Sequence, residues 1–225
     1  YLDATEVEFE ELPLLQRRIV KRCHELGTRV IVATQLLESM ITNPTPTRAE
    51  VTDVMNAAYE EADALMLSGE TSVGRYPERC VDALVRISTR IERTGGQGFG
   101  QGVLLRDERQ KTARAAVTLA DSLPDARLVV LTRRGILANQ VAMLRPRTSG
   151  FFPVTPKETV CRKMALTRGI TPLKLAFATT IEETIQRVTE QLLKDDLVRS
   201  GTPIVIVSDI LSDHFAANSI LLHHA

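Results

Sequence analysis

Hydroxyl and carboxylate side chains follow two short apolar runs in the first third of the chain. Thr34 comes directly after the apolar residues 30–33, and Ser68 and Glu70 follow the apolar residues 64–67. Short apolar runs of this kind are typical of buried parallel strands, whose C-terminal ends carry chemistry. A hydroxyl group donates and accepts hydrogen bonds, which suits proton relay. These three side chains are therefore candidate site residues. The alternative is that they only cap strand ends and bond to the backbone.

Three longer motifs surround these residues. They read Ala33-Thr34-Gln35-Leu36-Leu37-Glu38-Ser39-Met40, Pro46-Thr47-Arg48-Ala49-Glu50 and Met66-Leu67-Ser68-Gly69-Glu70-Thr71. In this order and spacing the motifs closely resemble pyruvate kinase, and a weaker resemblance continues to the C-terminus. The resemblance identifies the chain as the C-terminal portion of a pyruvate kinase, namely the end of the catalytic barrel followed by the regulatory domain.

The resemblance implies a glycolytic reaction and roles for the candidate residues. Pyruvate kinase transfers a phosphoryl group from phosphoenolpyruvate to ADP, giving pyruvate and ATP. Thr34 corresponds to the catalytic Thr that contacts the substrate and helps deliver the proton. Ser68 and Glu70 correspond to a hydrogen-bonded network that borders the substrate site. The family enzyme uses magnesium and potassium, and we expect neither to be bound to this chain.

Most of the family's active site is expected to lie upstream of this chain. The phosphate-binding Arg, the potassium ligands, the catalytic Lys and the metal-binding Glu precede this region in the family. The metal-binding Asp would fall on Leu2 rather than on Asp3. Each missing electrostatic contact costs several kcal/mol of barrier. We therefore expect no useful phosphoryl transfer from this chain alone.

A basic loop in the second half is a candidate effector site. Arg133 and Arg134 precede Gly135, between a predicted strand and a predicted helix, where free N–H groups favour an anion. The family's allosteric sugar-phosphate site uses this loop, so Thr132 to Gly135 are predicted to bind a phosphorylated effector. The loop of residues 209–213, which carries Asp209 and Asp213, stands where the family has a Gly-rich loop, and its acidic charge would disfavour a bisphosphate. The alternative is a solvated basic turn.

A helix predicted over residues 47–59 carries the third group of candidate residues. Thr47 is its expected N-cap, and Glu50 stands at the capping-box offset. The resemblance implies that this helix packs against its symmetry mate in a tetramer. Arg48 is therefore predicted to lie at a subunit interface of a homo-oligomer.

Composition narrows the classes of partner. The 225 residues are 44% hydrophobic, and 28 basic residues balance 28 acidic ones, so we expect no nucleic-acid partner. No apolar run approaches the ~20 residues of a membrane span, and we expect no membrane partner. The cysteines match no zinc or disulfide spacing and read as reduced thiols, which predicts a cytoplasmic location. The histidines show no ligand spacing and are predicted to lie on the surface: His24, His214, His223 and His224.

Helix and strand patterns alternate along the whole chain and predict an α/β fold. Residues 1–94 match the last two β/α units of a (β/α)8 barrel, whose remaining strands would lie upstream, because such a barrel needs about 250 residues. Residues 95–105 form a Gly-rich linker, expected to be flexible. Residues 106–225 predict an open, mostly parallel α/β sandwich, whose strands include the apolar runs 127–131 and 203–208. The first helix, residues 9–26, has Pro13 in its first turn and stops at Gly27. Its apolar spacing predicts a buried face formed by Leu12, Leu15, Ile19, Cys23 and Leu26.

Two readings other than a catalytic portion remain open. The chain can be a non-catalytic effector-binding or regulatory module derived from the pyruvate kinase C-terminal domain. It can also be a structural piece that only forms a subunit interface. The coding sequence upstream would distinguish these readings from the first.

Overall fold

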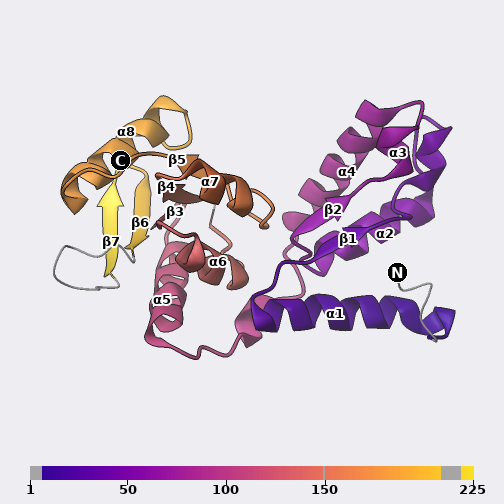
Figure 1. Cartoon of the computed structure of the whole chain (residues 1–225), viewed down its shortest axis with the longest axis horizontal. Coiled ribbons are helices and arrows are strands. Elements are labelled where there is room, and N and C mark those ends of the chain that lie inside the picture. Colours follow the sequence, from indigo (N-terminus) through magenta and orange to yellow (C-terminus); the bar gives the residue numbers. More distant parts are fainter. Residues whose placement is uncertain (1–6, 149, 209–218) are drawn as a thin grey trace. The chain divides into compact units, whose positions relative to one another are not determined.

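The computed structural model describes residues 7–148, 150–208 and 219–225. The chain divides into two compact units, Tyr1–Gly102 and Val103–Ala225 (Figure 1). The change of unit falls within residues 95–105, and the predicted domain limits stay a prediction. The expectations that concern Leu2, Asp3, residues 209–213 and His214 lie outside the described residues.

The first unit contains a two-stranded parallel sheet and the helices that pack beside it. In chain order its elements are η2 (Phe9–Glu11), α1 (Leu12–Leu26), β1 (Ile31–Ala33), η3 (Glu38–Ile41), α2 (Arg48–Tyr59), β2 (Ala64–Met66), α3 (Gly69–Ser72), α4 (Pro77–Glu92) and η4 (Phe99–Gly102). Ile31 pairs with Ala64 and Ala33 pairs with Met66. The predicted strands and longer helices are present, with strand ends shortened by one or two residues.

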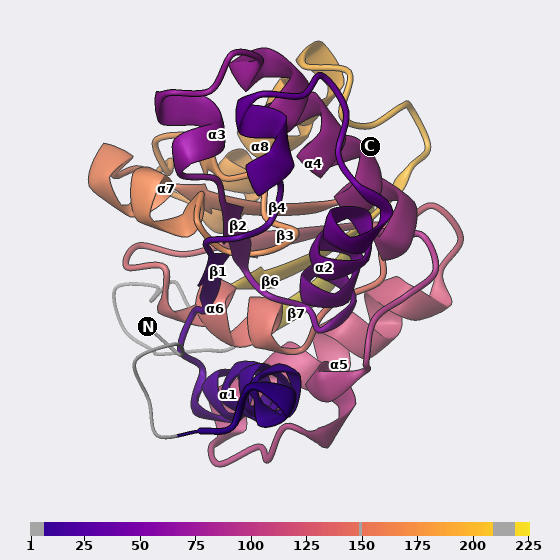
Figure 2. The ribbon, with the colours of Figure 1, turned by 90° about the vertical axis from the view of Figure 1, so that its right-hand side faces the viewer.

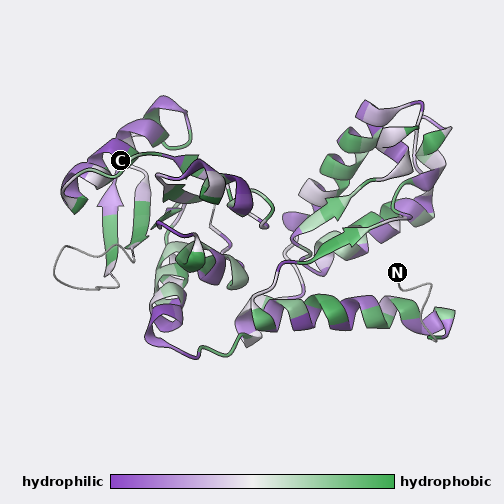
Figure 3. Ribbon diagram, viewed as in Figure 1, coloured by the Kyte–Doolittle hydropathy of each residue, from purple (hydrophilic) through white to green (hydrophobic). Residues whose placement is uncertain are grey.

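Helices α2 and α4 cover one face of this small sheet. Val32 and Leu65 point into a shared core with Val54 of α2 and Cys80 of α4. Side chains alternate between the two faces of a strand, so Ile31 and Ala33 of β1 and Ala64 and Met66 of β2 point the other way. Ile31 is 48% exposed and Met66 47%. Figure 3 shows that both strands are mainly hydrophobic. The sheet of the first unit is therefore apolar on both faces and covered on one.

Helix α1 buries a different face from the one predicted. The apolar spacing pointed to a stripe through Ile19, Cys23 and Leu26, but the buried residues are Val20 and His24, and Leu26 is exposed. The buried stripe is thus shifted by one residue, about 100° around the helix. The prediction that His24 lies on the surface is wrong, because α1 packs against η4 and the residues after α2. Gly27, with φ 69°, ends the helix as predicted.

The second unit is a five-stranded sheet with helices on both faces. In chain order its elements are α5 (Glu108–Ser122), β3 (Arg127–Leu131), α6 (Ile136–Met143), β4 (Phe151–Thr155), α7 (Glu158–Met164), β5 (Leu173–Lys174), α8 (Ile181–Lys194), β6 (Pro203–Ser208) and β7 (Ser219–His224). The strand order is β5-β4-β3-β6-β7, with β7 alone antiparallel. The prediction of an open, mostly parallel α/β sandwich is confirmed.

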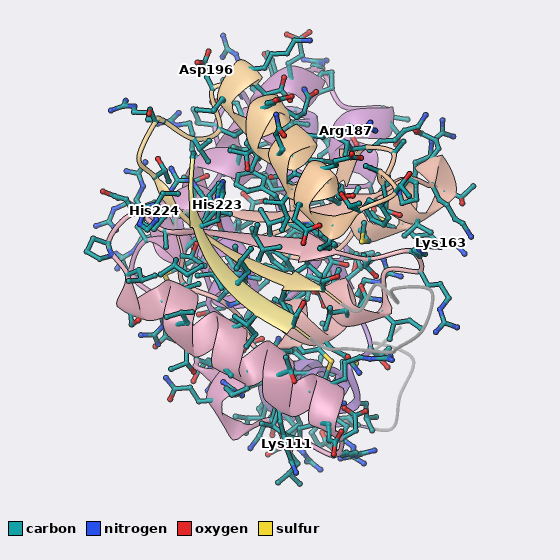
Figure 4. All side chains as sticks on the ribbon, turned by 90° about the vertical axis from the view of Figure 1, so that its left-hand side faces the viewer. Lys111, Lys163, Arg187, Asp196, His223 and His224 are labelled. Carbon is teal, nitrogen blue, oxygen red and sulfur yellow. The ribbon has the colours of Figure 1, made fainter. Side chains whose placement is uncertain are left out.

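Two apolar cores lie on opposite sides of this sheet. Leu128 and Val130 of β3 point toward α5 and α6, whereas Val129 and Leu131 point toward α8. Figure 2 and Figure 4 show the same layers, with α5 and α8 on opposite faces. The strands read as continuous apolar runs because both faces are covered. This arrangement places the turn after β3 at the C-terminal edge of the parallel strands.

Candidate functional site

The loops after β1 and β2 are joined by one buried carboxylate. Glu70 is 3% exposed; its Oε1 accepts a hydrogen bond from Leu37 N at 3.1 Å, and its Oε2 accepts one from Ser68 N at 2.7 Å. Leu37 belongs to the β1 loop, which we define as residues 34–46, and Ser68 follows β2. Because β1 and β2 are parallel, both loops leave the same edge of the sheet. Glu70 therefore ties together the two loops that carry Thr34 and Ser68.

The β1 loop begins with two residues in an unfavourable backbone conformation. Thr34 has φ 72° and Gln35 has φ 54°, both in the left-handed region. A β-branched residue rarely adopts this conformation, and such strain persists where the surrounding structure holds it. Both side chains are exposed. The hydroxyl of Thr34 therefore lies on an accessible, rigidly turned segment at the end of β1.

A second carboxylate, which the sequence suggested only as a helix cap, also holds this loop. Glu50 Oε1 accepts from Ser39 N at 2.6 Å, and Oε2 accepts from Ser39 Oγ at 2.6 Å. Oε2 also accepts from Thr47 N at 2.7 Å and Oγ1 at 2.9 Å, which completes the predicted capping box. Burial acts to raise the pKa of Glu50, but the hydrogen bonds from Ser39 and Thr47 outweigh it and lower the pKa. Glu50 is therefore held as a carboxylate between the β1 loop and α2.

Cys80 of α4 is packed beneath this corner. Its Sγ lies 3.7 Å from the carbonyl oxygen of Glu70 and 3.9 Å from that of Met40. Burial, and then the negative charge of Glu70, raise the pKa of the Cys80 thiol. A neutral, buried thiol is a poor nucleophile. Cys80 therefore supports the loops by packing.

The anion-loop residues divide into a buried support and an exposed pair of charges. Thr132 is completely buried; its Oγ1 accepts a hydrogen bond from Gly135 N at 3.1 Å, and its own N–H donates to Val154 O at 3.0 Å. Gly135 has φ 79° and is the N-cap of α6. Arg133 and Arg134 are exposed. The hydroxyl of Thr132 thus shapes the turn from inside, while the two arginines face solvent.

Arg48 is the first residue of α2, directly after the capping residue Thr47. Its side chain is exposed, and Val51, one turn further along, is also exposed. An exposed charge beside an exposed apolar residue is compatible with a contact to another chain. The subunit-interface role of Arg48 stays a prediction.

The described residues offer no ready-made metal site. No group of three or more His, Cys, Asp or Glu side chains in residues 7–148, 150–208 and 219–225 could hold a metal ion. Within the same residues no helix is long and apolar enough to cross a membrane.

The fold and the two loops define an α/β protein with a barrel-type segment followed by an open α/β sandwich. The family model described as pyruvate kinase, barrel domain, matches residues 4–81. The model described as pyruvate kinase, alpha/beta domain, matches residues 110–223. The chain belongs to the pyruvate kinase family.

Individual relatives agree with this assignment. Pyruvate kinase isozyme G, chloroplastic, of Ricinus communis is 38% identical over 205 residues, covering 90% of this chain and 49% of the relative. Pyruvate kinase of Geobacillus stearothermophilus is 32% identical over 230 residues, covering 97% and 38%. The crystal structure of a pyruvate kinase from Cryptosporidium parvum superposes with a TM-score of 0.86 at 27% identity, covering 96% of this chain and 44% of that one. The chain spans about half or less of the length of these relatives, and the predicted cytoplasmic location stays a prediction.

Proposed function

We propose that this chain forms one corner of the phosphoenolpyruvate site in a pyruvate kinase that converts phosphoenolpyruvate and ADP to pyruvate and ATP. One observation carries the proposal. The Glu70 carboxylate bonds to the backbone of Leu37 and Ser68, in the two loops at the C-terminal edge of β1 and β2, and Thr34 begins the first of these loops. In barrel enzymes this edge is where substrates bind. Family membership supports the assignment of the reaction.

In this proposal Thr34 relays a proton, and Ser68 and Glu70 position the loops around it. The Thr34 hydroxyl is exposed and can donate a proton while it accepts another. Both Glu70 oxygens bond to backbone N–H groups, so Glu70 acts through the loops. Transfer of the phosphoryl group needs positive charge around it. The family residues that supply this charge, the phosphate-binding Arg, the catalytic Lys and the metal ligands, are expected upstream of this chain, so we propose that the chain by itself does not catalyse the transfer.

A chimera tests the proposal. The N-terminal part of the Geobacillus stearothermophilus relative would be joined to this chain, and pyruvate release measured with magnesium and potassium present. We expect the chimera to turn over and the unfused chain to give no pyruvate above background. Thr34→Val should lower kcat about 100-fold, because it removes the proton-relaying hydroxyl and keeps the shape. Thr34→Ser is the matched control and should retain most activity.

Two results would contradict this assignment. An unfused chain with robust turnover would show that it carries a complete site. A folded Thr34→Val chimera with unchanged kcat would show that the hydroxyl takes no part. A loss of kcat with unchanged KM in Thr34→Val, restored in Thr34→Ser, would support a role in the chemical step.

The second candidate function is binding of a phosphorylated effector by the second unit. It is supported by the exposed pair Arg133 and Arg134 at the start of α6, where N–H groups of the first turn point outward. Thr132 and Gly135 form the buried base of this turn. The site would take a monophosphate or inorganic anion, because Ile136 and Leu137 offer no polar groups for a larger ligand.

A further inference from the structure

Glu61 occupies a backbone position that disfavours its side chain. It lies two residues beyond the end of α2 with φ 64°, in the left-handed region where glycine is normally found. It is also 5% exposed, which is rare for a glutamate. A disfavoured conformation that persists points to a role for the residue that holds it. The contacts of the carboxylate identify this role.

The Glu61 side chain lies across the glycine-rich segment that follows α4. Its Oε1 accepts a hydrogen bond from Gly98 N at 3.0 Å. A Cβ atom added at Gly96 would lie 2.3 Å from the same oxygen and 2.5 Å from Glu61 Cγ, so any larger residue there would push the Glu61 side chain out of its place. A neighbouring backbone bond, from Gln97 N to Tyr59 O at 3.0 Å, holds the segment to the end of α2.

The other side of the carboxylate faces α1 and η4. His24 of α1 is 3% exposed, and its Nε2 lies 4.0 Å from Glu61 Oε2. The His24 ring meets Phe99 of η4 edge to face, with ring centroids 6.1 Å apart. The adjacent Glu60 accepts hydrogen bonds from Gln16 and Arg17 of α1, each at 3.1 Å. Three elements of the first unit therefore meet around Glu61.

We propose that Glu61 is a latch that fastens the glycine-rich segment, residues 95–102, to the first unit. Five of the nine residues from Thr94 to Gly102 are glycine, and such a composition is flexible unless it is tied down. The latch removes that freedom through one hydrogen bond, the close fit over Gly96 and the contact with His24. When the latch opens, the segment that leads toward the second unit becomes mobile while α1 and α2 stay folded.

Two substitutions that suit a left-handed backbone test the latch. Glu61→Gly and Glu61→Asn both relieve the strain at φ 64°, and neither side chain can reach Gly98. We expect amide exchange at Gly98 and chymotrypsin cleavage after Phe99 to speed up about tenfold or more, since a hydrogen bond to a charged group is lost. Tyrosine fluorescence reports the first unit alone, because the tyrosines are Tyr1, Tyr59 and Tyr76. Its denaturation midpoint should be unchanged or higher.

Asp125→Gly is the matched control. Asp125 has φ 52° and lies in the second unit, so this substitution relieves similar strain without touching the segment. It should leave Gly98 exchange and Phe99 cleavage unchanged. Wild-type rates in both Glu61 variants would overturn the proposal. Loss of the folded tyrosine signal in both would also overturn it, because Glu61 would then support the whole unit rather than fasten one segment.

Discussion

At the level of single residues, two carboxylates hold the loops of the candidate site in place through hydrogen bonds to other protein groups. Glu70 bonds to backbone N–H groups on both loops, and Glu50 bonds to the backbone and hydroxyl of Ser39. Charge-assisted hydrogen bonds are stronger than neutral ones. Together they hold the loop in which Thr34 and Gln35 keep a strained backbone. The proposed proton relay at Thr34 depends on this support.

The lowered pKa of Glu50 predicts a pH dependence of the first unit. A depressed pKa contributes stability that is fully present above the pKa of the unfolded state and is lost as the pH falls through the folded value. Glu50→Gln should therefore be less stable than the parent at about pH 7, and the difference should shrink toward about pH 3.5. Urea titrations followed by tyrosine fluorescence measure this. A difference that is constant over this range would contradict the prediction.

The basic pair at the start of α6 predicts weak anion binding. Phosphate should shift the amide signals of Arg134 and Gly135 in a saturable way, and salt should weaken the effect because both arginines are exposed. Arg134→Ala should reduce the affinity several-fold, since one of two full charges is lost. Lys111→Ala, an exposed charge on α5, is the control and should change nothing. If the parent protein shows no saturable shift, the anion site is rejected and both arginines are solvated surface charges only.

At the level of elements, α2 links the loop, the capping box and the proposed interface. Its N-terminus is fixed by the reciprocal hydrogen bonds between Thr47 and Glu50, and Glu50 also accepts a hydrogen bond from the backbone of Ser39. A change at the start of α2 therefore reaches the β1 loop directly. Thr47→Ala should destabilise the first unit by about 1 kcal/mol, the usual loss for an N-cap. Tyrosine-monitored urea unfolding would show this loss, and an unchanged midpoint would show that the cap is dispensable.

The exposed start of α2 predicts self-association of the chain. If Arg48 crosses a subunit boundary, Arg48→Glu reverses the charge there and should weaken association by tenfold or more, about 1.4 kcal/mol. Sedimentation velocity over a concentration series measures the change. Arg18→Glu, an exposed charge on α1, is the matched control. A parent protein that is monomeric at every concentration would contradict the prediction.

At the level of the whole molecule, the two units differ in how well their sheets are covered. The sheet of the second unit has five strands with apolar cores on both faces. The sheet of the first unit has two strands, and Ile31 and Met66 on its outer face are about half exposed. Two-stranded sheets are only marginally stable in water, and open edges exchange readily. The first unit should therefore be the less stable of the two.

Hydrogen exchange on the monomer tests this difference. The amides of Val32 and Leu65 should exchange faster than those of Val129 and Val205, which lie in central strands of the larger sheet. Tyrosine fluorescence should also lose its folded signal at lower urea than circular dichroism loses its overall signal. Equal, high protection in both units would contradict the prediction and point to another chain that covers the small sheet.

The sequence by itself determined the order and type of the main elements and the family. Continuous apolar runs predicted β3 and β6 with the bounds that the structure has, because strands covered on both faces are apolar at nearly every position. Local signals also predicted the capping box of Thr47 and Glu50 and the helix end at Gly27. These features depend on residues at most four apart, so the order of residues alone encodes them.

Only the tertiary structure decided which polar groups are buried and what they bind. His24 lies inside because the elements packed against α1 select the face that carries Val20 and His24, although the apolar spacing of the helix favours the neighbouring face. Glu70 meets Leu37 across 33 positions, and Glu61 meets Gly98 across 37. No local spacing specifies such pairs. They form because the packing of strands and helices brings distant backbone N–H groups to a buried carboxylate that must be satisfied.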